Sequence, residues 1–104
     1  MAARITAQDF DELVLKAGVP VLVDFYSDTC VPCKMMSGVV GDIEDETEET
    51  AKIYKVNVNY EESLAETYNV LSVPTFLVFQ GGAETARLTG VVAKDVLMKA
   101  LTNN

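Results

Sequence analysis

The feature that most constrains the fold is an alternation along the chain between short apolar runs and segments with helical periodicity. Residues 21–26 form one apolar run between Pro20 and Ser27, and residues 74–79 form another that begins at Pro74 and ends before Gln80. Runs of this length are typical of buried strands. Between them, apolar residues recur every three or four positions, as they do on one face of an amphipathic helix. This alternation predicts an α/β fold built around a sheet.

The first half of the chain predicts two strands, each followed by a helix. We expect a short strand at Ile5 and then a helix that Thr6 opens with Asp9 in a capping box, and that ends at Gly18. Residues 21–26 are the central strand. The helix after them is expected to have an apolar face formed by Met36, Val39, Val40 and Ile43. Gly38 and Gly41 can weaken or bend this helix.

The second half predicts three more strands and two helices. Residues 53–58 alternate as a strand does, and Asn59 with Glu62 is expected to cap a short helix that carries Leu64 and Tyr68. Residues 74–79 and 85–89 form an antiparallel hairpin across Gly81-Gly82, and residues 92–101 form a terminal helix. The order βαβαβαββα gives a mixed five-stranded sheet flanked by four helices, in one domain over residues 1–104.

The charge balance excludes several classes of partner. Eight basic and 16 acidic residues give a net charge of −8, which argues against nucleic acid or an anionic membrane surface. The acidic run at residues 44–49 is expected to be a solvated helix end, with a docking patch for a basic partner as the alternative. No apolar run is long enough to span a membrane, and the N-terminus lacks the apolar core of a signal peptide. We therefore expect a cytoplasmic protein.

Two cysteines in the pattern Cys30-Val31-Pro32-Cys33 follow the central strand directly. A short loop carries Cys30 outward to a helix N-terminus, where unpaired N–H groups and the helix dipole favour a thiolate, and Pro32 fits the first helical turn. Cys30 is therefore the predicted nucleophile of a reversible dithiol/disulfide pair. A static disulfide would stabilise the fold by only about 2 kcal/mol. A structural zinc site is disfavoured because the chain has two cysteines and no histidine.

Asp24 is the one acid inside the apolar run at residues 21–26. Burial of a carboxylate is costly, so we expect its pKa to be raised, which makes the group usable as a proton shuttle. The alternative is an aspartate that is simply paired with Lys55.

Over essentially its whole length the chain resembles the thioredoxin family. The resemblance rests on the two cysteines, on the strand around Asp24, on Lys55, on the segment 72–75 around Pro74, and on Gly90. The chain departs from the family pattern at four positions: Val31 replaces a glycine, Thr29 and Tyr26 stand where tryptophan is common, and Gly38 replaces a proline. These departures bear on redox potential and partner choice rather than on the chemistry itself.

The resemblance implies a protein disulfide reductase in which Cys30 attacks the substrate and Cys33 resolves the mixed disulfide. It implies that Asp24 exchanges a proton with Cys33, that Lys55 modulates Asp24, and that the peptide bond before Pro74 is cis. Val73 would pair with an extended substrate as an added strand. The implied substrate-contacting surface consists of Thr29, Val31, Pro32, Val73, Gly90 and Val91, with Met35 as a further apolar candidate. The implied partners are a thioredoxin reductase and disulfide-containing proteins; no bound cofactor and a monomeric state are expected.

Three other functions stay open at this stage. A binding subunit of the same fold would remain active without its thiols, a glutaredoxin-like enzyme would turn over glutathione, and an oxidase or isomerase would have an oxidising potential. The extra N-terminal strand and helix, together with Asp24 and Lys55, fit the thioredoxin pattern better than the glutaredoxin pattern.

Overall fold

A five-stranded sheet forms the centre of the computed structural model, which describes residues 2–102. Its spatial order is β1-β3-β2-β4-β5, where β1, β3 and β2 run parallel and β4 and β5 are antiparallel to their neighbours. The mixed sheet expected from the sequence is confirmed. The strands are β1 Ala3–Arg4, β2 Val21–Tyr26, β3 Lys52–Asn57, β4 Thr75–Gln80 and β5 Ala83–Thr89.

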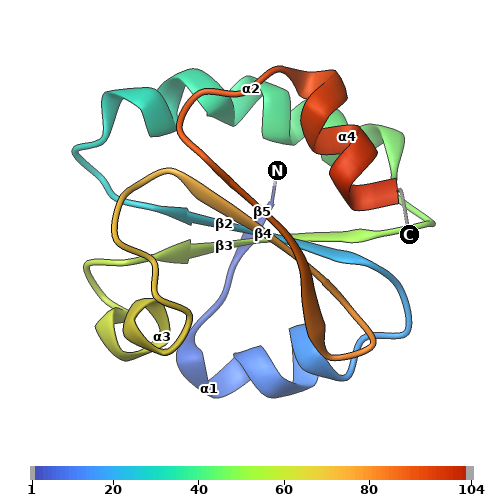
Figure 1. Cartoon of the computed structure of the whole chain (residues 1–104), viewed down its shortest axis with the longest axis horizontal. Helices are drawn as coiled ribbons and strands as arrows, with labels where there is room; N and C mark the ends of the chain where they lie inside the picture. Colours follow the sequence, from blue (N-terminus) through green and yellow to red (C-terminus); the bar gives the residue numbers. More distant parts are fainter. Residues whose placement is uncertain (1, 103–104) are drawn as a thin grey trace.

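Helices cover both faces of the sheet (Figure 1). Helices α2 and α4 lie on one face, whereas α1 and α3 lie on the other. Their bounds are α1 Ala7–Phe10, which continues as the π-helical segment η1 Asp11–Leu15, then α2 Val31–Glu46, α3 Glu62–Thr67 and α4 Lys94–Thr102.

Strand β2, at the centre of the sheet, is deeply buried because it pairs with a strand on each side and has helices above and below. It pairs with β3 and β4, and its residues from Val21 to Phe25 are all at most 3% exposed. Strands in this position are apolar on both faces, which explains the continuous run in the sequence. Asp24 is the exception in that run, and so β2 sets a carboxyl inside the core.

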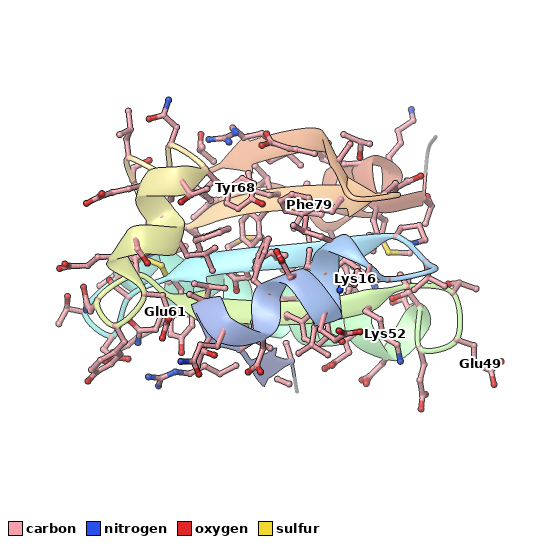
Figure 2. The ribbon with its side chains drawn as sticks, turned by 90° about the horizontal axis from the view of Figure 1, so that it is seen from below. Lys16, Glu49, Lys52, Glu61, Tyr68 and Phe79 are labelled. Carbon is pink, nitrogen blue, oxygen red and sulfur yellow. A yellow bond between two sulfur atoms is a disulfide. The ribbon has the colours of Figure 1, made fainter. Side chains whose placement is uncertain are left out.

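The core consists of two clusters, one on each side of the sheet. Beneath α1 and α3, Phe10, Tyr68 and Phe79 pack ring against ring, with centroids 5.2 to 5.5 Å apart, and Figure 2 shows Tyr68 beside Phe79. Two of the three pairs are edge-to-face, the geometry that aromatic quadrupoles favour. The other cluster packs α2 and α4 against the sheet through a set that includes Leu22, Met36, Ile43, Phe76, Leu97 and Leu101.

Helix boundaries at the α1 end differ from the sequence expectation. Phe10 and Val14, which are four positions apart, form the buried face of this helix. The predicted capping box does not form: Thr6 Oγ1 donates to the Asp9 carboxylate at 3.2 Å, and the Thr6 side chain makes no bond to the helix backbone. The helix also widens into a π-turn, in which the Lys16 N–H donates to the Asp11 carbonyl.

The predicted cap of α3 by Asn59 and Glu62 is wrong. Glu61 occupies the N-cap position, and the Asn59 N–H donates instead to Asn57 Oδ1 at 3.0 Å. The Glu61 carboxylate accepts a hydrogen bond from the N–H of Ala7 at the start of α1, 54 positions away in the sequence. An acid that looks local in the sequence therefore ties two helices together.

Helix α2 runs without interruption through Gly38 and Gly41. It ends within the acidic run, and Glu46 forms an ion pair with Lys94 of α4. Glu48 and Glu49 beyond it are exposed, as expected for a solvated helix end. Within residues 2–102, no helix combines the length and the apolar character needed to cross a membrane.

Candidate active site

Cys30 and Cys33 are joined by a disulfide at the N-terminus of α2. Cys30 is the N-cap residue, with extended backbone angles, and Pro32 lies in the first helical turn, as predicted. Strand β2 ends four residues before Cys30, so the rigid centre of the sheet sets the position of the pair. The Cα atoms of the two cysteines are 5.2 Å apart, within the range that a disulfide requires.

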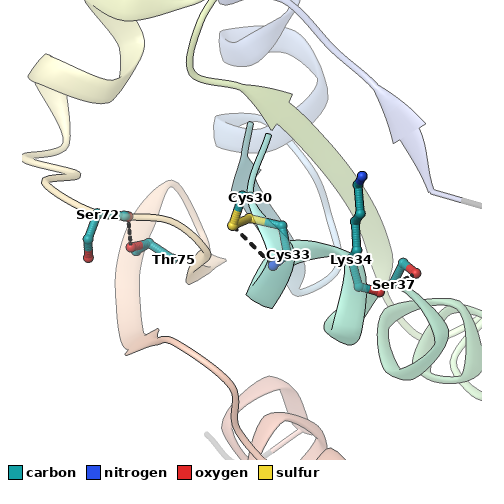
Figure 3. Close-up of a disulfide and its surroundings, with 6 residues drawn as sticks. All are labelled: Cys30, Cys33, Lys34, Ser37, Ser72 and Thr75. Carbon is teal, nitrogen blue, oxygen red and sulfur yellow. Dashed lines mark hydrogen bonds between the residues drawn. A yellow bond between two sulfur atoms is a disulfide. The ribbon is translucent and has the colours of Figure 1, made fainter. Parts of the chain in front are cut away.

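The helix tip supplies a hydrogen bond to the Cys30 sulfur. The backbone N–H of Cys33 donates to Cys30 Sγ at 3.1 Å, as drawn in Figure 3. A donor at the positive end of a helix stabilises negative charge on sulfur. Cys30, which the loop was expected to carry outward, is largely buried in this disulfide form, since both cysteines are 8% exposed.

The segment before β4 lies next to the disulfide, and Figure 3 shows Ser72 and Thr75 on the same side as Cys30. The Val73–Pro74 peptide bond is cis. Two hydrogen bonds hold this segment: Thr75 Oγ1 donates to the Ser72 carbonyl at 2.7 Å, and the Gly90 N–H donates to the Pro74 carbonyl at 2.9 Å. Gly90 has φ +80°, a conformation that glycine adopts without strain.

Exposed apolar side chains include three of the predicted surface residues. Val31, Met35 and Val91 are between 54% and 66% exposed, although large apolar side chains are more often buried. Thr29 and Pro32 are also exposed. Val73 is half-buried, and within the described part of the chain its backbone N–H and C=O make no hydrogen bond. Those two backbone groups are therefore free to pair with another chain.

Asp24 is buried, and it lines the same hollow as Cys33. Its side chain is 3% exposed, and its Oδ1 atom has no hydrogen-bond partner among residues 2–102. Burial raises the pKa of Asp24 to about 6, and the positive charge of Lys55 partly opposes that rise. The raised pKa expected from the sequence is confirmed.

Two hollows give the Asp24 carboxyl access to its surroundings. The smaller, of about 170 Å³, is lined by Asp24, Cys33, Lys34, Asp28 and Lys55 among others, so it joins the carboxyl to the second cysteine. The larger, of about 260 Å³, lies under α2 and is also lined by Asp24 and Lys55. The smaller hollow is lined by polar groups and is large enough to hold water between the Asp24 carboxyl and Cys33.

Lys55 does not form the direct ion pair with Asp24 that was the alternative interpretation. The two residues are neighbours across β2 and β3, but within residues 2–102 no ion pair joins them. The Lys55 ammonium instead lies over the ring of Tyr26, 4.3 Å from its centroid. Lys55 therefore acts on Asp24 through space rather than by contact.

One residue of the site was missed by sequence reasoning. Asn57, at the end of β3, is fully buried, and its side-chain amide donates to Asp28 Oδ1 at 3.1 Å. This bond ties the loop that precedes Cys30 to the neighbouring strand. A polar residue that closes an apolar strand next to the cysteine loop was the only available signal in the sequence.

Within the described residues, no group of three or more His, Cys, Asp and Glu side chains is placed to hold a metal ion. The charged side chains that line the smaller hollow with Cys33 are the carboxyls of Asp24 and Asp28 and the ammonium groups of Lys34 and Lys55. This set suits proton transfer and thiolate stabilisation.

The chain resembles known proteins over its full length. The family model described as Thioredoxin matches residues 1–103. A thioredoxin from Rickettsia bellii is 33% identical, with 100% of this chain and 99% of the relative covered. Thioredoxin 1 from Nostoc is 38% identical, with 96% and 94% covered, and the chloroplastic M-type thioredoxin from Chlamydomonas reinhardtii is 33% identical, with 96% and 71% covered. Since one family model and near full-length relatives agree, the chain belongs to the thioredoxin family of thiol–disulfide oxidoreductases.

Proposed function

We propose that this chain, as a single thioredoxin domain, reduces disulfide bonds in other proteins through Cys30 and Cys33. The observation that carries the proposal is the Cys33 N–H donating to Cys30 Sγ at the tip of α2. This donor stabilises the Cys30 thiolate, which is the form of cysteine that attacks a disulfide.

The reaction takes place in two exchanges. Cys30 thiolate attacks one sulfur of the substrate disulfide, the substrate S–S bond breaks, and the departing sulfur takes up a proton. Cys33 then loses its proton and attacks Cys30 Sγ, which releases the second substrate sulfur as a thiolate that is protonated in turn. Two electrons have passed to the substrate, and the chain is left with its own disulfide.

In this proposal Asp24 accepts the Cys33 proton through the smaller hollow. Its pKa of about 6 leaves it mostly ionised at neutral pH, when it can act as a base. Lys55 modulates the charge of Asp24 without neutralising it by direct contact.

We propose that substrates bind along Val73 and the exposed residues around the cysteines. The unpaired backbone of Val73 offers a donor and an acceptor to an extended segment. Val31, Val91 and Met35 offer apolar contacts, while Thr29, Pro32, Pro74 and Gly90 shape the surface between them.

The proposed electron donor is a thioredoxin reductase, and the proposed acceptors are proteins with accessible disulfides. We further propose a monomer without bound cofactor in the cytoplasm, because a pair recharged by a reductase requires a reducing compartment.

The test is the reduction of insulin disulfides with dithiothreitol as electron source. We expect the native protein to accelerate reduction, Cys30→Ser to abolish the acceleration, and Cys33→Ser to accumulate a mixed disulfide with insulin, detected by mass spectrometry. Circular dichroism controls for folding. Acceleration that survives in Cys30→Ser, or a folded native protein with two free thiols and no activity, would contradict the proposal.

A further inference from the structure

The position of Lys55 is set by two competing groups. Asp24 and Tyr26 lie two residues apart on β2, so their side chains share one face of the sheet. Lys55 is the register partner of Asp24 on the adjacent parallel strand β3 and projects from the same face. A carboxylate and an aromatic ring thus stand within reach of one ammonium group.

The ammonium lies on the ring. Lys55 Nζ is 4.3 Å from the Tyr26 centroid, and the Asp24 Oδ1 atom has no partner among residues 2–102. Tyr26, Asp24 and Lys55 all line the smaller hollow. Coulomb attraction falls with distance, and a cation held on the ring stabilises the carboxylate less than one in contact with it.

We propose that Tyr26 is a positioning residue that holds the Lys55 ammonium over its ring, away from Asp24, and thereby keeps the carboxyl a weaker acid. The expected effect of Tyr26 on turnover rests on the proposed proton transfer by Asp24. The expected effect of Tyr26 on the acidity of Asp24 is independent of that proposal.

The other charged groups around Asp24 come from three elements. Lys34 of α2 and Asp28 of the β2–α2 loop line the smaller hollow, and Cys33 lies there too. Arg4 of β1 is the register partner of Lys55, but its guanidinium lies over the ring of Tyr60 at 4.8 Å. Strand β4 presents the apolar Phe76 opposite Asp24. All of these groups stay the same in the variants below.

The test measures the pKa of Asp24 by NMR titration of its carboxyl carbon in the disulfide form, where neither cysteine titrates. Tyr26→Leu removes the ring, and we expect the pKa of Asp24 to fall by about one unit as Lys55 moves to the carboxylate. Tyr26→Phe keeps the ring and is expected to leave the pKa near the native value.

Loss of a bulky ring also admits water, which would lower the same pKa. Lys55→Met separates the two causes. With the ammonium gone, Tyr26→Leu is expected to leave the pKa of Asp24 where Lys55→Met alone puts it. A shift that persists in the double variant, or no downward shift in Tyr26→Leu, would overturn the proposal.

A second measurement keeps this inference distinct from the proposed mechanism. The pH profile of insulin reduction is expected to move to lower pH in Tyr26→Leu by the same amount as the pKa of Asp24. If that pKa moves as expected and the profile does not, the role of Asp24 in proton transfer fails, while the positioning role of Tyr26 stands.

Discussion

Among single residues, Asp24 makes the stability of the fold depend on pH. Its pKa is about 6 in the fold against 3.8 for an ordinary aspartate, because burial disfavours the charged form. Between these two pH values the native state binds more protons than the unfolded chain. The native state is therefore more stable relative to the unfolded chain when Asp24 is protonated, and this stability is lost as the pH rises through about 6.

We expect the free energy of unfolding to fall by up to about 3 kcal/mol between pH 4 and pH 8 on account of Asp24. Asp24→Asn has no such titration, and its stability should lack this part of the decline. Urea unfolding of both proteins in the disulfide form, across that range, measures the difference. Parallel stability curves for the two proteins would show that Asp24 titrates normally.

Some residues of the site could be predicted from the local sequence, and others could not. The cysteine pair at a helix N-terminus follows from spacing and a preceding strand, and Asp24 is conspicuous as the one charge in an apolar run. The position of Lys55 over Tyr26 and the bond from Asn57 to Asp28 depend on side chains from two strands meeting, and no local pattern encodes them.

At the scale of elements, Gly41 of helix α2 lies where no neighbouring group requires the absence of a side chain. A Cβ built on Gly41 meets no atom within 4 Å, whereas one built on Gly82 lies 3.2 Å from the Leu15 carbonyl. Gly82 also has φ +84°, in the two-residue turn between β4 and β5. The two glycines therefore make opposite demands on a substituted alanine.

Gly41→Ala is expected to stabilise the protein by about 0.5 to 1 kcal/mol, because alanine has the higher helix propensity. Gly82→Ala is the matched control and is expected to destabilise it by about 1 kcal/mol or more, since the turn requires a positive φ. Urea unfolding of both variants at one pH measures the two effects. Equal effects of the two substitutions would contradict the distinction.

Elements could be predicted where burial sets the pattern. The sequence interval 21–26 matches β2 without error, since a strand buried on both faces is continuously apolar. The cap of α3 was mispredicted because Asn59 bonds to Asn57 while Glu61 binds the first helix. The π-turn of η1 was not predicted, because helical periodicity alone does not distinguish a π-helical segment from an α-helix.

For the molecule as a whole, the net charge of −8 is the dominant long-range term. Like charges repel one another across the surface and destabilise the compact state. An increase in NaCl from about 20 mM to about 300 mM shortens the screening length to less than about 10 Å. Added salt is expected to raise the free energy of unfolding at pH 7 by a few tenths of a kcal/mol, measured as an increase in the urea midpoint.

Near the isoelectric point of about 4.3 the excess negative charge vanishes, and the same addition of salt should no longer stabilise the fold. Measurements at both pH values control for effects of salt that are unrelated to charge. A salt effect of equal size at both pH values would speak against repulsion as its cause.

The amide of Cys33 meets the sulfur of Cys30 in the form where both sulfurs are bonded to each other. A thiolate at the same place is a stronger acceptor for the same donor, so helix α2 keeps its first cap in either redox state. Gaining or losing two electrons then requires little rearrangement of the main chain. A thiol–disulfide oxidoreductase built in this way can offer nearly the same main-chain surface before and after each exchange.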